Sequence, residues 1–178
     1  DCLLSRGLGD VYKRQGYVCG ISLEKIIEGL EASLPEVGRQ EVNTNADGVL
    51  VINDAYNANP DSMRASLSTF ASMDVSGKRI AVLGDMGELG DFAQACHEGI
   101  GKVIAELPID YLLCIGELAG YIASAALESG FPRDRIETTL SKGEALGILE
   151  PLVEEGDAVL VKASHSMELE RIVRGLLS

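Results

Sequence analysis

The sequence lacks the features of a membrane or exported protein. It has no tryptophan, only three phenylalanines and no long apolar run. A membrane-spanning helix needs about 20 consecutive apolar residues, so we expect no membrane span. The N-terminal DCLLSRGLGD has neither the unbroken apolar stretch nor the small-residue cleavage site of a signal peptide. We therefore expect a cytoplasmic protein.

Positive charge is also scarce. The chain has 15 Lys and Arg against 28 Asp and Glu, which gives a formal net charge of −13 at pH 7. Nucleic acid and anionic lipid are attracted by basic fields, so we expect neither as a partner. The four cysteines, Cys2, Cys19, Cys96 and Cys114, show no C-x-x-C spacing. Three of them lie in apolar or helical settings, which is typical of buried thiols, and we expect no metal site.

Two common nucleotide-binding signatures are missing as well. No G-x-x-x-x-G-K-[ST] occurs, so the chain has no P-loop of its own. No G-x-G-x-x-G follows a strand, which weakens a dinucleotide-binding interpretation. Of the two histidines, His97 falls in a predicted helix and is expected to be a partly exposed helix residue. His165 falls in a loop, where a catalytic role and the role of an ordinary loop residue both stay open. Neither has the spacing of a metal site or a nucleophile relay.

The chain does contain a regular alternation of apolar strands and amphipathic helices. Ser22 is a candidate helix N-cap, and a hairpin with its turn at 46–48 is followed by a helix from about 61 to 73. Further strands are predicted at 79–85, 110–116, 135–140 and 157–164, with helices at 92–106, 118–129, 142–154 and from 167 onward. Continuous apolar strands followed by helices predict an α/β fold, with a doubly wound, mostly parallel sheet covered on both faces.

Ligands of such sheets bind at the carboxyl ends of the strands. The loops DAYNANP, GDMGELG, IGE and KASHS, which follow the predicted parallel strands, should therefore share one edge.

Several polar residues of this edge have two possible roles. Asp54 could accept two hydroxyl hydrogen bonds, as from a ribose. Asn57 and Asn59 either recognise a ligand or only shape the turn and cap the next helix. Arg39 and Lys162 are the cations best placed to meet an anion, with a solvated charge as the alternative.

The acidic residues of GDMGELG also have two possible roles. Asp85 and Glu88 could orient water or a cation, or could only form an ordinary turn.

Four motifs, in order, resemble the Mur ligases. They are Gly38-Arg39, NDAYNANPDSM, VLGDMGELG with a later Cys96-His97, and VKASHSMELERIV. The resemblance covers nearly everything from Gly16 onward. The wording of DAYNANP is most similar to the members that add D-alanyl-D-alanine to UDP-N-acetylmuramoyl-tripeptide in peptidoglycan synthesis. The alternatives are a ligase of the folylpolyglutamate or cyanophycin type, or a stand-alone α/β nucleotide-binding module without catalysis.

The resemblance implies a three-domain, ATP-dependent enzyme of which this chain is the last part. Residues 16–38 resemble the end and hinge of the central ATP-binding domain, and residues 39–178 resemble the Rossmann-like C-terminal domain. Residues 1–15 are expected to be non-native, because one reading frame of a common sequencing adapter encodes DVYKRQ; a genuine charged helix end is the alternative. Without a P-loop the chain is expected to be inactive alone.

The resemblance also implies roles for individual residues. Arg39 resembles the catalytic arginine that reaches the γ-phosphate, and Asp54 resembles the acid that holds the ATP ribose. The predicted nucleotide-binding residues are Asp54, Tyr56, Asn57 and Asn59. The predicted substrate-binding residues are Lys162, Ser164, His165 and Ser166. The family often has glycine where this chain has Ala163.

The cofactors implied are ATP and Mg²⁺, the latter bound mainly by the central domain. The implied substrates are UDP-N-acetylmuramoyl-tripeptide and D-alanyl-D-alanine, and we expect a monomer.

Overall fold

The computed structural model describes residues 15–31 and 38–178. The chain divides into two compact units, residues 1–36 and 37–178. In the first unit, α2 (Leu23–Glu31) begins after Ser22, whose Oγ accepts a long hydrogen bond of 3.5 Å from the amide of Lys25. This confirms the predicted helix start. The predicted non-native segment lies, except for residue 15, outside the described residues. So do residues 32–37 of the segment 16–38, which is predicted to form the end and hinge of the central domain.

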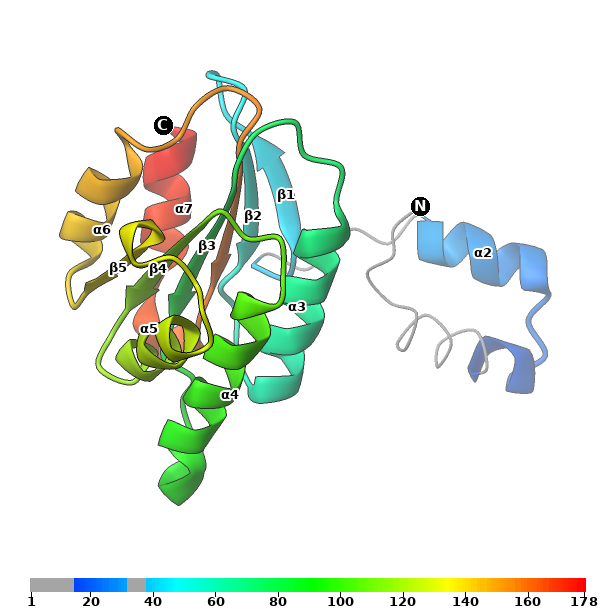
Figure 1. The fold of residues 1–178 in the computed structure, drawn as a ribbon. Coiled ribbons are helices and arrows are strands. Elements are labelled where there is room, and N and C mark those ends of the chain that lie inside the picture. Colours follow the sequence, from blue (N-terminus) through cyan, green and yellow to red (C-terminus); the bar gives the residue numbers. More distant parts are fainter. Residues whose placement is uncertain (1–14, 32–37) are drawn as a thin grey trace. The chain divides into compact units, whose positions relative to one another are not determined.

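The second unit is built on one six-stranded sheet with the order β1-β2-β6-β3-β4-β5 (Figure 1). Its strands are β1 (Glu41–Thr44), β2 (Leu50–Asp54), β3 (Arg79–Gly84), β4 (Tyr111–Ile115), β5 (Ile136–Thr139) and β6 (Ala158–Lys162). β1 pairs antiparallel with β2, and all other neighbours are parallel. The predicted α/β fold with a mostly parallel sheet is confirmed.

The predicted hairpin is formed by β1 and β2. The turn is organised by Asn45, whose Oδ1 accepts hydrogen bonds from the amides of Asp47 (3.0 Å) and Val49 (2.9 Å). Gly48 adopts φ +80, a left-handed conformation that glycine takes without strain. The edge strand is thus joined tightly to β2, whose carboxyl end carries the DAYNANP loop.

Helices cover both faces of the sheet (Figure 1). α3 (Pro60–Ser72), α4 (Ala93–Ala105) and α5 (Ala119–Glu128) contribute to the core on one face, and α6 (Lys142–Leu149) and α7 (Glu170–Leu177) to the core on the other. Successive strand residues point to opposite faces: Ala81 and Leu83 of β3 belong to the first core, and Ile80 and Val82 to the second.

Two helix boundaries differ from the prediction. α6 ends at Leu149, five residues early, and α7 begins at Glu170 rather than at Met167. Residues 165–167 form a 3₁₀ turn instead, and Glu168 follows with a left-handed φ of 49. A left-handed residue cannot continue an α-helix, so the chain turns before α7 starts.

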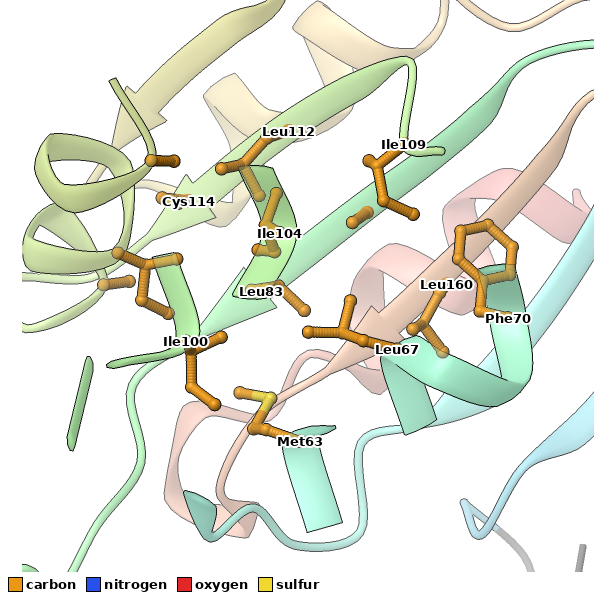
Figure 2. Close-up of a cluster of buried hydrophobic side chains, with 14 of the residues drawn as sticks. Met63, Leu67, Phe70, Leu83, Ile100, Ile104, Ile109, Leu112, Cys114 and Leu160 are labelled. Carbon is orange, nitrogen blue, oxygen red and sulfur yellow. The ribbon is translucent and has the colours of Figure 1, made fainter. Parts of the chain in front are cut away.

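The first core is a continuous apolar layer between the sheet and α3 and α4 (Figure 2). Met63, Leu67 and Phe70 form one stripe of α3, as the helical spacing predicts, and all are almost fully buried. Cys114 is also fully buried here, and burial raises the pKa of its thiol, which keeps it uncharged.

The expectation of buried thiols holds only for Cys114 among the described cysteines. Cys96 is half-buried and Cys19 is exposed, and Cys2 lies outside the described residues.

The ends of the central strands lie very close together. A Cβ on Gly84 would come within 2.7 Å of the Cβ of Ala163, so β3 can end beside the KASHS loop only because residue 84 has no side chain. Ala163 itself is fully buried. None of the helices in residues 15–31 and 38–178 has the length and apolarity needed to cross a bilayer.

Candidate functional site

A cavity of about 540 Å³ lies at the carboxyl ends of β2, β3 and β6. Six predicted site residues line it: Tyr56, Asn57, Asn59, Ser164, His165 and Ser166. Ala58 and residues 87–89 complete the lining. The DAYNANP, GDMGELG and KASHS loops therefore share one edge as predicted. The remaining loop, IGE, leads into α5, whose first amide, that of Ala119, donates a hydrogen bond of 2.7 Å to Asp85 Oδ1 in the GDMGELG loop.

Three predicted site residues, Arg39, Asp54 and Lys162, are not part of the cavity lining. Asp54 and Lys162 form a buried ion pair, with 2.7 Å between Oδ2 and Nζ. Lys162 Nζ also donates to the carbonyl of Asn57 at 3.0 Å, and Asp54 Oδ1 accepts from the amide of Gln40 at 3.2 Å. The solvated-charge alternative is therefore wrong for Lys162, whose side chain is only 3% exposed.

The ion pair bears on whether Asp54 suits a ribose. A carboxylate has about four acceptor positions. Two of those of Asp54 are taken, one by Lys162 Nζ and one by the amide of Gln40. Acceptor capacity for hydroxyl groups thus remains, but the Asp54 side chain is only 9% exposed. The ribose-binding role of Asp54 stays a prediction.

Arg39 lies beside the cavity rather than in it. Its guanidinium carbon is 4.0 Å from the centroid of the Tyr56 ring, a cation–π geometry. The rings of Tyr56 and His165 have centroids 6.0 Å apart, and the His165 side chain is 79% exposed. These three side chains connect the Arg39 turn, the DAYNANP loop and the KASHS loop near the carboxyl ends of β2 and β6.

Asn59 begins α3. Its Oδ1 accepts from the amide of Ser62 at 2.8 Å, and its own amide donates to Ser62 Oγ at 3.0 Å, which is a capping box with Pro60 in the first turn. The capping alternative is confirmed for Asn59. Asn57 shapes the loop, since its Oδ1 accepts from the amide of Ala58 at 2.8 Å. Roles for either residue in ligand recognition stay predictions.

Ser164 connects three loops. Its Oγ accepts from the amide of Gly87 at 2.6 Å and reaches the carbonyl of Ala58 at 3.4 Å. Its amide donates to the carbonyl of Asp85 at 3.0 Å. Because the hydroxyl is buried and already bonded, Ser164 holds the cavity wall together. The sequence placed Ser164 in a loop but gave no sign of these partners.

The prediction for His97 is wrong. We predicted a partly exposed helix residue, but the side chain is fully buried and its ring contacts the GDMGELG loop. A signal was available, since His97, Ile100 and Ile104 lie on the same side of α4 at helical spacing and all are buried.

Metal ligands do not gather at this edge. In residues 15–31 and 38–178 no group of three or more His, Cys, Asp or Glu side chains could hold a metal ion. Asp85 is engaged as a cap of α5. Binding of Mg²⁺ therefore stays a prediction from resemblance.

Comparison with known proteins identifies the domain. Residues 38–165 match the model of the family described as "Mur ligase, glutamate ligase domain". The chain belongs to the Mur ligase family. This match begins at the Gly38-Arg39 motif and covers the sheet through β6 and every cavity-lining residue except Ser166.

Individual Mur ligases are similar over most of the chain. The UDP-N-acetylmuramoyl-tripeptide–D-alanyl-D-alanine ligase of Bacillus subtilis is 38% identical over 162 residues, which is 91% of this chain and 35% of that protein. The ligase of the same name from Mycobacterium tuberculosis is 36% identical over 178 residues, 90% of this chain and 35% of that protein. The chain thus spans about a third of the length of these curated relatives.

Solved structures agree with this assignment. MurF from Acinetobacter baumannii superposes with a TM-score of 0.78 at 32% identity, covering 91% of this chain and 35% of that one. MurF ligase from Thermotoga maritima, solved in complex with ADP, superposes with a TM-score of 0.76 at 26% identity, covering 92% of this chain and 35% of that one. A bifunctional folylpolyglutamate synthase from Yersinia pestis, at 24% identity and a TM-score of 0.59, shares the fold alone.

Proposed function

We propose that this chain is the C-terminal part of an ATP-dependent ligase that joins D-alanyl-D-alanine to UDP-N-acetylmuramoyl-tripeptide in peptidoglycan precursor synthesis. The observation that carries the proposal is the 36–38% identity to ligases of that name across about nine-tenths of the chain. In this proposal residues 16–38 end a central ATP-binding domain, residues 39–178 form the C-terminal domain, and the enzyme is a cytoplasmic monomer.

The reaction forms an amide bond. When bound, ATP would supply the γ-phosphoryl group that activates the terminal carboxylate of the tripeptide as an acyl phosphate, with ADP as the leaving group, and Mg²⁺ would offset phosphate charge. The amine of D-alanyl-D-alanine would then attack the acyl carbon and lose a proton, and phosphate would leave from the tetrahedral intermediate. Such a mechanism needs fixed cations near the phosphates and a site closed to water, because water would hydrolyse the acyl phosphate.

The residues of this chain would contribute charge, shape and closure. Arg39, whose guanidinium lies over the Tyr56 ring, would offset charge on the γ-phosphate. Tyr56, Asn57 and Asn59 would line the nucleotide, and Asp54 would hold its ribose. The segment from Ser164 to Ser166, which lines the same cavity, would receive the dipeptide. Lys162, paired with Asp54, would hold the cavity-lining loop through the carbonyl of Asn57. Domain closure would exclude water.

A chimera tests this proposal. The first two-thirds of the Bacillus subtilis ligase, which carry the parts that this chain does not span, would be joined to residues 38–178. We expect ATP-dependent addition of D-alanyl-D-alanine to the UDP-linked tripeptide, measured as product by mass spectrometry, and no ligation by the 178-residue chain alone.

Two further measurements complete the test. In the chimera, Arg39→Ala should lower turnover by a factor of roughly ten to a thousand if the guanidinium stabilises charge that builds in the transition state. A folded chimera that ligates a different amine, or ligation by the isolated chain, would contradict the proposal.

A further inference from the structure

His97 has both ring nitrogens bonded at the back of the cavity wall. The ring is 0% exposed. Nδ1 is 2.6 Å from the carbonyl oxygen of Ala93, one turn earlier in α4, and Nε2 is 2.9 Å from the amide nitrogen of Met86. A carbonyl only accepts hydrogen bonds, so Nδ1 carries the proton, and Nε2 accepts from the Met86 amide. The two partners together require a neutral ring protonated at Nδ1.

This ring determines the path of the next residues. Met86 is held by His97, and the following amide, Gly87, is held by Ser164 Oγ at 2.6 Å. Glu88 then adopts φ 60, a conformation that costs a non-glycine residue free energy unless its neighbours are fixed. Residues 87–89 line the cavity together with the DAYNANP loop. One wall of the cavity is thus fixed from behind by a side chain that does not line it.

We propose that His97 is a positioning residue for the cavity: its neutral ring fixes the Met86 amide and thereby the face that residues 87–89 present to a bound ligand. The part of the inference that concerns catalysis rests on the proposed ligase function. The part that concerns the loop rests only on the geometry of this chain.

Two variants that differ in the length of the side chain separate a positioning role of His97 from a packing role. In His97→Gln the side-chain oxygen extends to about the place of Nε2 and can accept from Met86. In His97→Asn the polar atoms extend only to about the place of Nδ1, so the loop bond is lost while a polar side chain remains. Ile104→Ala, a buried position further along α4, is the control for lost packing in the same helix.

The first measurement is hydrogen exchange in the 178-residue chain, read at single amides by NMR. In His97→Asn the Met86 and Gly87 amides should exchange about tenfold faster relative to the amides of β3, because a buried hydrogen bond is lost. His97→Gln should restore most of the protection. Ile104→Ala should not raise the exchange rates of these two amides relative to those of β3. Equal exchange in the Asn and Gln variants would overturn the proposal. If the Asn variant does not fold, His97→Leu, which fills the space without an acceptor, replaces it.

The second measurement uses the chimera described above. His97→Asn should raise KM for ATP or for D-alanyl-D-alanine about tenfold with a smaller change in kcat, because the wall contributes to binding; His97→Gln should restore KM. Unchanged KM for both in an active chimera would overturn the catalytic part. A chimera inactive even with His97 would instead contradict the proposed ligase function, while the exchange result would still decide the role of His97 in the loop.

Discussion

Lys162 illustrates how tertiary contacts change the role expected of a single residue. From its loop position we expect Lys162 either to meet an anion or to remain a solvated charge. In the folded chain its charge is balanced by Asp54, with 2.7 Å between Nζ and Oδ2, and the pair is buried. The solvated charge is thereby excluded, and a role of Lys162 in substrate binding stays a prediction. Removing two charges from water is costly, and the attraction within the pair offsets that cost only while both partners are present. The pair therefore couples the end of β2 to the end of β6.

Loss of one partner should be far more damaging than loss of both. Lys162→Met leaves the Asp54 carboxylate buried without its counter-charge, and we expect it to lower the free energy of unfolding by about 3–5 kcal/mol. The double variant Asp54→Asn, Lys162→Met should recover most of this loss, because no isolated charge remains. Urea unfolding of the 178-residue chain measures both.

Lys142→Met is the matched control. This lysine pairs with Glu168 at 3.3 Å, and both side chains are substantially exposed, so its loss should cost less than about 1 kcal/mol. If Lys162→Met and Lys142→Met cost the same, the buried pair does not stabilise the sheet edge as argued.

At the scale of elements, the start of α3 depends on Asn59. Asn59 and Ser62 exchange hydrogen bonds between side chain and backbone, which satisfies two amides that a helix N-terminus otherwise leaves unpaired. α3 contributes Met63, Leu67 and Phe70 to the first core. A weak start to this helix would therefore disturb both the core and the DAYNANP loop before it.

Asn59→Ala should lower the free energy of unfolding by about 1 kcal/mol, within a range of roughly 0.5–2, because the cap to the Ser62 amide is lost. Asn59→Asp keeps an acceptor of the same shape and should stay within a few tenths of the original stability. Denaturant titration of the two variants gives the comparison. An equal loss in both would mean that the cap contributes nothing beyond the size of the side chain.

At the scale of the whole molecule, every member of the two apolar cores lies in the second unit. The core residues run from Val49 to Leu176, and the sheet runs from Glu41 to Lys162. A unit with its own sheet and cores on both faces can fold by itself. The family match, residues 38–165, lies within this unit.

Residues 38–178 should therefore unfold in one cooperative transition when produced alone, as measured by circular dichroism in increasing urea. A shorter version ending at residue 156 is the control. It lacks β6, which pairs with both β2 and β3, so the sheet would be split and no cooperative transition is expected. Failure of 38–178 to show a transition would mean that the second unit is not an independent domain.

The sequence alone determined what depends on local patterns. Periodicity and caps located the hairpin and the helices with boundaries off by a few residues, and continuous apolar strands gave the parallel sheet. The same reasoning placed four loops at one edge, three of which line the cavity. These features follow from short-range preferences that one segment carries by itself. Motif wording was needed for the family, because loop chemistry without partners left recognition and capping equally open.

Only the tertiary structure decided which side chains meet. The last strand, β6, inserts between β2 and β3, which brings Lys162 to Asp54 across 108 residues and Ser164 to Gly87 across 77. The burial of His97 against Met86 likewise depends on how α4 packs against the GDMGELG loop. No local pattern contains these pairings, because they depend on strand order and on the packing of elements far apart in the chain. Hence the residues that shape the cavity from behind became visible only in the fold.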